Sequence, residues 1–149
     1  MKAASKLSVT MAAAALLGLS ALPAAAAGRL TIVEHPTDER TIHVPGGTED
    51  AVGDTLVFAN PVFDAADRKQ VGSDQGWCVR TVVGKSWECF WTTILKEGLI
   101  TVEGPFYDTG DSTFVVTGGS GRYAGAKGSM KLHWRDEKGS AYDFIFDLK

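Results

Sequence analysis

The sequence is poor in the residues that build metal centres and nucleophilic sites. Its 149 residues include two cysteines, three histidines and a single asparagine, Asn60. The histidines, His35, His43 and His133, lack the spacing that metal ligands show, so we expect no metal site. No motif for an organic cofactor is complete either, and we expect none to be bound.

One glycine-rich stretch, GGSGRYAGAKGS at 118–129, is the nearest approach to a cofactor loop. Lys127 is followed by glycine instead of the Ser or Thr of a phosphate loop, and the third glycine of a dinucleotide fingerprint is missing. Arg122 stands where a nucleophile elbow has its closing glycine. We interpret the stretch as a hairpin corner. Any chemistry is then limited to binding, proton transfer or the shaping of a reactive ligand.

Positive charge is scarce as well. Lys and Arg number 15 against 18 Asp and Glu, which gives a net charge of −3 at pH 7. This balance argues against nucleic acid or an anionic membrane as a partner. The one long apolar run, Val9 to Leu22, is too short to span a bilayer with its flanks, so we expect no membrane span.

Residues 1–27 predict a secretory signal peptide. Lys2 and Lys6 precede the apolar run, and Ala25-Ala26-Ala27 follows the small-residue cleavage rule. Residues 24–26 form an equally acceptable cleavage site. A core helix at the N-terminus is the alternative, but the run has no amphipathic stripe. We therefore expect a secreted or periplasmic protein whose mature part, residues 28–149, is one domain.

The mature part shows alternating apolar and polar residues and no convincing helical period, which predicts an all-β fold. About eight strands, with turns every 8–12 residues, favour an antiparallel barrel or sandwich. The polar residues 64–75 are expected to form an exposed loop. These strands are expected within 28–35, 55–63, 76–83, 87–94, 99–106, 112–117, 129–135 and 141–148, with a short additional strand at 41–44.

The two cysteines lie on the central pair of these strands. A turn centred between Val83 and Gly84 places Cys78 opposite Cys89 and Arg80 opposite Trp87. Facing cysteines in an oxidising compartment can form a disulfide. A slip of one residue would put the two sulfurs on opposite faces and leave both thiols free. We favour the disulfide because of the export signal.

Two polar residues interrupt apolar strands. Glu34 shares a face with Leu30 and Ile32, so its carboxylate lies either at the wet end of the strand or inside a cavity. Asn60 stands between aromatic residues and must find hydrogen-bond partners there. It either caps a bulge next to Pro61 or points its amide into a pocket.

Four segments, taken in order, carry a resemblance to a known family. They are GDTLVFANPVFD (53–64), GWCV (76–79), ITVEGPF (100–106) and VTGGSGRYAGAKG (116–128). Together they resemble the allene oxide cyclase barrel family, and the last is similar in dirigent proteins. The resemblance implies an eight-stranded antiparallel barrel with a hydrophobic cavity, often trimeric. Cyclases of this family convert an unstable fatty-acid epoxide into a cyclopentenone, and dirigent proteins steer the coupling of phenoxy radicals.

The resemblance also implies roles for single residues. Asn60 matches the asparagine that holds a water near the developing oxyanion, and Cys78 matches a pocket cysteine that orients the substrate. Glu34 matches the first-strand glutamate that promotes opening of the epoxide. Phe106 stands where the cyclases carry a tyrosine, so that hydroxyl is absent here. These matches make Asn60, Glu34 and Cys78 the candidate catalytic residues.

Three functional hypotheses follow. The first is a barrel that binds a hydrophobic or aromatic small molecule and guides its cyclisation or coupling, as an isomerase without a cofactor. The second is a lipocalin-like binding protein without turnover, and the third is a structural barrel filled by its own side chains. In the first, Asn60 and Glu34 orient the ligand, and the expected wall is Phe58, Trp77 or Trp91, Phe106 and Phe114.

Overall fold

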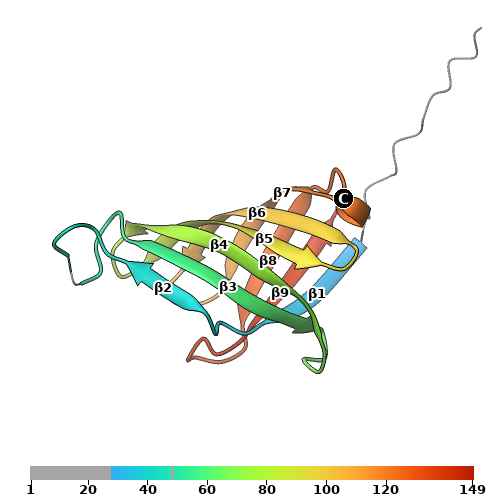
Figure 1. The fold of residues 1–149 in the computed structure, drawn as a ribbon, viewed down its shortest axis with the longest axis horizontal. Helices are drawn as coiled ribbons and strands as arrows, with labels where there is room; N and C mark the ends of the chain where they lie inside the picture. The colour runs from blue at the N-terminus through green and yellow to red at the C-terminus, as the bar shows by residue number, and fades with distance from the viewer. Residues whose placement is uncertain (1–27, 48) are drawn as a thin grey trace, which may run out of the picture.

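The structure, a computed structural model, describes residues 28–47 and 49–149, so the predicted signal peptide at 1–27 lies outside the described residues. The described part is nearly all β-strand (Figure 1). Its nine strands are β1 (Gly28–Glu34), β2 (Glu39–Ile42), β3 (Thr55–Asp64), β4 (Gln70–Val82), β5 (Ser86–Leu95), β6 (Gly98–Tyr107), β7 (Ser112–Gly119), β8 (Gly128–Trp134) and β9 (Tyr142–Leu148). One short 3-10 turn, Gly121–Tyr123, precedes β8.

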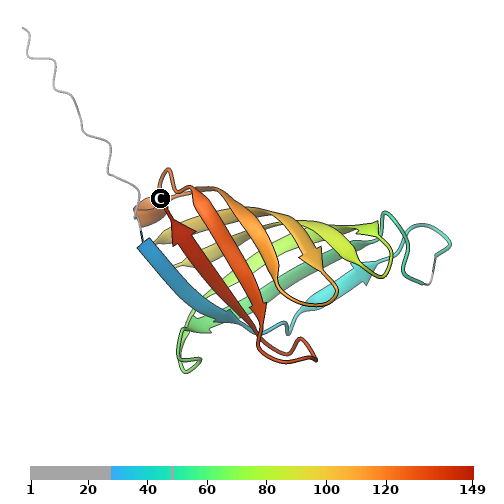
Figure 2. The ribbon, with the colours of Figure 1, turned by 180° about the vertical axis from the view of Figure 1, so that it is seen from behind.

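Eight of these strands close into an antiparallel barrel. Strands β3 to β9 pair in sequence order, and β1 pairs with β9 on one side and with β3 on the other. Figure 2 shows β9 lying between β1 and β8. The remaining strand, β2, lies outside this ring and pairs with the first half of β3, over Thr55 to Phe58. The prediction of an eight-stranded antiparallel barrel is therefore confirmed, with one additional strand.

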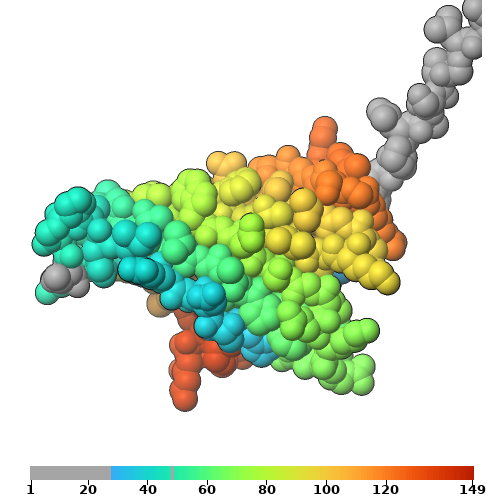
Figure 3. Space-filling model, viewed as in Figure 1, coloured from blue at the N-terminus to red at the C-terminus, as the bar shows by residue number. Residues whose placement is uncertain are grey.

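Side-chain alternation fills the inside of the barrel. Residues at alternate positions on β6 to β9 point inward and are almost fully buried, as a period of two requires. This core includes Ile100, Val102, Phe114, Met130, Phe144 and Phe146. The loop between β2 and β3 extends from one end of the molecule (Figure 3). No helix among the described residues is long and apolar enough to cross a membrane.

The register of β4 and β5 agrees with the sequence prediction. Cys78 pairs with Cys89, and Arg80 pairs with Trp87. The two cysteines form a disulfide, so neither is free. The Arg80 guanidinium lies 3.9 Å from the centre of the Trp87 ring and bonds to Asp50 and Asp108. These contacts tie the β2–β3 and β6–β7 loops to this end of the barrel.

The predicted loop over residues 64–75 is present and mostly exposed at 65–69, but the prediction is wrong from Gln70 onward. Strand β4 begins at Gln70, and Asp74 within it is fully buried. The segment is polar, which suggested solvent, but alternation sends Gly72, Asp74 and Gly76 inward. Both glycines lie so close to the backbone of β5 that a methyl group at either position would overlap it. Asp74 is thus the one bulky side chain in this part of the inner row of β4.

Candidate functional site

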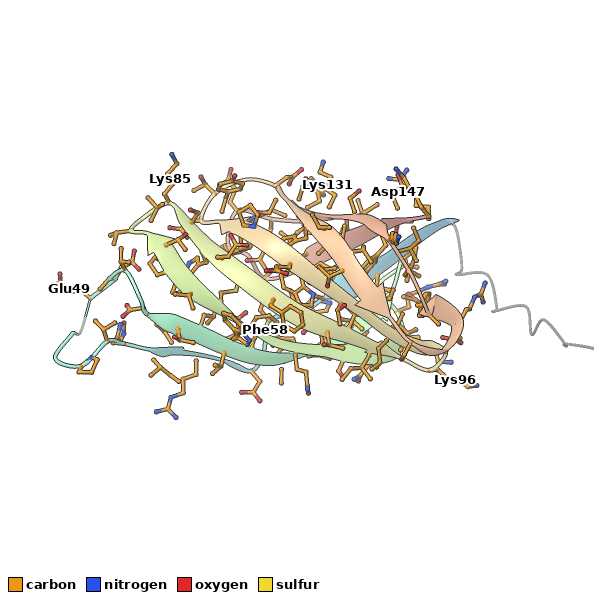
Figure 4. The ribbon with its side chains drawn as sticks, turned by 90° about the horizontal axis from the view of Figure 1, so that it is seen from above. Glu49, Phe58, Lys85, Lys96, Lys131 and Asp147 are labelled. Atoms are coloured by element: carbon orange, nitrogen blue, oxygen red, sulfur yellow. A yellow bond between two sulfur atoms is a disulfide. The ribbon has the colours of Figure 1, made fainter. Side chains whose placement is uncertain are left out.

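A cavity of about 90 Å³ opens at the end of the barrel where β1 stops and β3 and β9 begin. Its wall is mainly aromatic and aliphatic, as is usual for small-molecule sites. Phe58, labelled in Figure 4, contributes to it from β3. The lining residues are Glu34, Glu39, Leu56, Phe58, Cys78, Cys89, Trp91, Phe106, Leu132, Tyr142 and Phe144. Two carboxyl groups and one phenol are therefore the titratable groups in an otherwise apolar wall.

Glu34 and Asn60 form the polar centre of the site. The Asn60 side-chain nitrogen donates to Glu34 Oε1 at 2.7 Å, and both residues are buried. Asn60 Oδ1 accepts the backbone N–H groups of Thr37 and Asp38 at 2.9 and 3.0 Å. The asparagine therefore fixes the turn between β1 and β2 and, with its other end, the orientation of the Glu34 carboxyl.

Burial decides the protonation of Glu34. Loss of hydration raises the pKa of this carboxyl well above its usual value, and the nearby charge of Asp74 raises it further. The hydrogen bond from Asn60 opposes the shift but is the smaller effect. Glu34 is therefore suited to carry a proton at a pH where an exposed glutamate has lost its own, as a general acid must.

Asp74 lies behind this pair, outside the cavity lining. Its Oδ1 accepts the backbone N–H of Asn60 at 3.3 Å. Burial raises the pKa of Asp74 to about 8, against the lowering effect of that hydrogen bond. Two carboxyl groups thus flank Asn60 inside the barrel. The charge of Asp74 raises the pKa of Glu34, and the charge of Glu39 raises the pKa of Asp74.

Tyr142 is the third titratable group of the wall. It pairs with Glu34 across β9 and β1. Burial and the neighbouring carboxylates raise the pKa of its phenol, so the hydroxyl keeps its proton throughout the neutral range. The hydroxyl can therefore donate a hydrogen bond to a bound molecule. Tyr142 thus gives the pocket a phenol hydroxyl, which Phe106 does not supply.

The cysteines enter the wall as a disulfide. Cys78 and Cys89 both line the cavity, but their sulfurs are joined. A thiol at Cys78 is therefore not available to bond a ligand, and the bridge contributes apolar, polarisable surface instead. The expected role of Cys78 in orienting a substrate reduces to shaping the wall.

Among the aromatic residues expected in the wall, Phe58, Trp91 and Phe106 are there. Phe114 is fully buried behind Trp91, with ring centres 4.4 Å apart, and supports the wall without lining it. Trp77 does not line the cavity: it is 47% exposed on the outer face. The reason is alternation, because the neighbouring Cys78 points inward.

Sequence reasoning missed three titratable residues of the site, besides the apolar lining residues Leu56, Leu132 and Phe144. Glu39 and Tyr142 line the cavity, and Asp74 lies behind it. Tyr142 was in an expected strand, and its place opposite Glu34 follows once β1 is known to pair with β9. Nothing in the local sequence marked Asp74, whose neighbours are polar or glycine.

The comparisons with known proteins agree with this geometry. The allene oxide cyclase family matches residues 35–135, about two thirds of the chain. The chain belongs to the allene oxide cyclase family. Glu34, the carboxyl in the cavity, lies just before the matched range, whereas Asn60, the disulfide and the aromatic wall around Trp91 lie within it.

Solved structures of the same architecture carry several activities. A pyocyanin demethylase is 27% identical, with a TM-score of 0.67, and the match covers 80% of this chain and 100% of the demethylase chain. The pterocarpan synthase dirigent protein PsPTS1 is 15% identical, with a TM-score of 0.66 and coverage of 82% and 96%. The Diels-Alderase AbmU from Streptomyces koyangensis is 16% identical, with a TM-score of 0.61 and coverage of 83% and 69%. The chain thus has a barrel fold that supports several different small-molecule transformations in other proteins.

Proposed function

We propose that this chain is an exported barrel that binds a hydrophobic or aromatic small molecule in its cavity and guides its cyclisation or coupling, as an isomerase without metal or organic cofactor. One observation carries the proposal: a buried carboxyl, Glu34, is held by Asn60 on an otherwise apolar and aromatic wall. A disulfide in the cavity wall supports export, because such bonds persist in oxidising compartments.

The proposed chemistry uses Glu34 as an acid. A protonated Glu34 donates its proton to an oxygen of the bound ligand, and that oxygen takes the electron pair of its bond to carbon as the bond breaks. The proton returns to the Glu34 carboxylate when the product forms. The reaction is therefore an isomerisation that consumes no proton and no second reactant. Asn60 contributes by holding the carboxyl in one orientation. General acid catalysis of this kind is worth roughly 10²–10⁴-fold in rate.

The aromatic wall supplies the remaining contribution, which is to hold the ligand in a reactive shape. Trp91 lies at the base of the cavity against Phe58, Phe114 and Phe144, with ring centres 4.4–6.0 Å apart. Such packing makes a rigid surface for a ring or a folded chain. A cavity of about 90 Å³ is smaller than the ~300–1,000 Å³ that encloses a whole drug-sized ligand. It fits one ring-sized group, with the rest of a larger molecule at the open end.

Binding without turnover is the second candidate, and one observation favours it. Both ends of the Asn60 amide already have protein partners, the backbone of Thr37 and Asp38 at the oxygen and Glu34 at the nitrogen. An amide engaged in this way is a structural clamp and has little left to offer an oxyanion. In that case the cavity would hold its ligand unchanged, in the manner of a lipocalin.

Native mass spectrometry of protein purified from its own source tests the proposal. A co-purifying hydrophobic molecule would identify the ligand class, and the same spectrum would reveal whether the trimer implied by the family forms. Two probes follow: pyocyanin, which a 27% identical relative demethylates by name, and an allene oxide generated in the assay. Conversion of a probe or of the co-purified ligand supports an enzyme. Tight binding without conversion supports the second candidate. If no probe binds and no ligand co-purifies, both candidates are contradicted.

A further inference from the structure

Four buried side-chain atoms have no hydrogen-bond partner among residues 28–47 and 49–149: Asp74 Oδ2, Thr93 Oγ1, Trp91 Nε1 and Trp134 Nε1. Asp74 and Thr93 are both fully buried. Asp74 on β4 and Thr93 on β5 are directly paired in the register of the two strands. Both occupy inward-facing positions, so their two unpartnered atoms belong to neighbouring side chains.

Asp74 and Thr93 continue a row of buried polar side chains that begins in the cavity with Glu34 and Asn60. Asn60 donates to Glu34 with its side chain and to Asp74 with its backbone N–H. Asn60 and Asp74 are themselves a cross-strand pair. The row therefore runs from β1 through β3 and β4 to β5, and it ends at Thr93 without a terminal partner.

Leaving such atoms without a partner is costly, because a buried carboxyl or hydroxyl that has lost its hydration is strongly destabilised. We propose that Asp74 and Thr93 bind one water molecule inside the barrel, between Asp74 Oδ2 and Thr93 Oγ1. Water fits this site because it can both donate and accept. It can therefore hydrogen-bond to the Asp74 carboxyl in either protonation state. It can also bond to the Thr93 hydroxyl, which can rotate to donate or to accept.

The donor set also argues against other small guests. Calcium takes six or more oxygen ligands and magnesium takes six, whereas this site offers Asp74 Oδ2 and Thr93 Oγ1. An apolar guest would leave both atoms without hydrogen bonds. A single water with two or three polar partners is the usual occupant of such positions in protein interiors.

The bound water gives Asp74 a positioning role. With Oδ2 held by the water, Oδ1 stays aimed at the backbone N–H of Asn60, and Asn60 keeps its side chain on Glu34. The water thus anchors the inner end of the row whose outer end is the cavity carboxyl. The site does not depend on the proposed function, because neither Asp74 nor Thr93 lines the cavity.

A crystal structure of the purified protein at a resolution that defines ordered water tests the proposal directly. The expected result is a peak about 2.6–3.2 Å from both Asp74 Oδ2 and Thr93 Oγ1. A direct hydrogen bond between the two side chains, with no peak, would overturn it. An empty ligand cavity in the same crystals would bear on the proposed function alone.

A matched pair of variants gives a second test in solution. Thr93→Val keeps the shape but removes the hydroxyl, so the water loses a partner and Tm should fall by roughly 3–8 °C. Thr92→Val, on the outer face of the same strand, should change Tm by less than about 2 °C. A Thr93→Val protein as stable as the wild type would contradict a role for that hydroxyl in holding water.

Discussion

Glu34 and Tyr142 occupy paired positions on β1 and β9, and both side chains line the cavity. Burial raises the pKa of each group, and the Glu34 carboxyl adds to the rise at Tyr142. Two proton-bearing oxygens of different acidity therefore lie on one side of an apolar pocket. This arrangement suits a ligand that needs one group to give a proton and another to hold an oxygen in place.

The first prediction concerns Glu34→Gln. The amide keeps the size of the side chain but cannot release a proton, so turnover of the ligand should fall by about 100-fold or more. Product formation, followed by chromatography, measures the loss, and Tm should remain close to that of the wild type. Glu88→Gln, on the exposed face of β5, is the control and should retain full activity. An active Glu34→Gln protein would remove the acid from the mechanism.

The second prediction concerns stability and pH. Asp74 has a pKa of about 8 in the folded protein and an ordinary value near 3.9 when unfolded. Between these values the folded state binds more protons than the unfolded state, so its stability should fall as pH rises from about 4 to about 8. Glu34 acts in the same direction. Urea midpoints measured across this range should therefore decline with pH in the wild type.

Asp74→Asn tests the origin of that decline. The amide cannot ionise, so the slope above about pH 5 should flatten, and the variant should gain on the wild type at high pH. Asp147→Asn, an exposed change on β9, should leave the slope as it was. An unchanged slope in Asp74→Asn would show that another group is responsible.

The third prediction concerns the disulfide. Cys78 and Cys89 are 11 residues apart, and a bridge over such a short loop stabilises the fold by roughly 2–3 kcal/mol. The double variant Cys78→Ser, Cys89→Ser should lower the unfolding free energy by about that amount, measured by urea titration. Intact mass before and after reduction should differ by two hydrogens. Equal masses would show free thiols in the purified protein.

The fourth prediction concerns Gly76. This residue pairs with Trp91, and a methyl group there would overlap the Phe90 carbonyl and the Trp91 Cβ. Gly76→Ala should therefore displace the indole, destabilise the protein by about 1–3 kcal/mol and change its near-UV circular dichroism. Gly118→Ala is the control, since its methyl would lie 3.4 Å from Thr101 Oγ1, an ordinary contact. A Gly76→Ala protein with unchanged stability and spectrum would show that β4 can move away.

Much of the fold could be predicted because its rules are local. The alternation at Cys78 and Arg80, with one glycine turn at Gly84, was enough to place the cysteines opposite each other and Arg80 opposite Trp87. The same alternation determines where Trp77 points. Adjacent residues of a strand face opposite sides of the sheet, so Trp77 faces outward because Cys78 faces inward.

The site was harder because it depends on closure of the barrel. Glu34 and Asn60 are 26 positions apart, and they meet because β1 pairs with the second half of β3. Before that pairing was known, a wet strand end and a cavity were equally consistent with Glu34. Asp74 was missed for a different reason: a buried carboxylate between glycines has no apolar pattern around it, so polarity alone suggested a surface loop.

The same closure sets the two ends of the barrel domain next to each other. Gly28 at the start of β1 pairs with Leu148 at the end of β9, and Figure 1 shows these two strand ends side by side. The cavity residues Glu34 and Tyr142 lie at the other ends of the same two strands. A short peptide could join these ends and new ones could be opened elsewhere, which would make a circular permutant with its pocket untouched. For the same reason, a fluorescent label or surface tether attached after Lys149 would leave the mouth of the pocket clear.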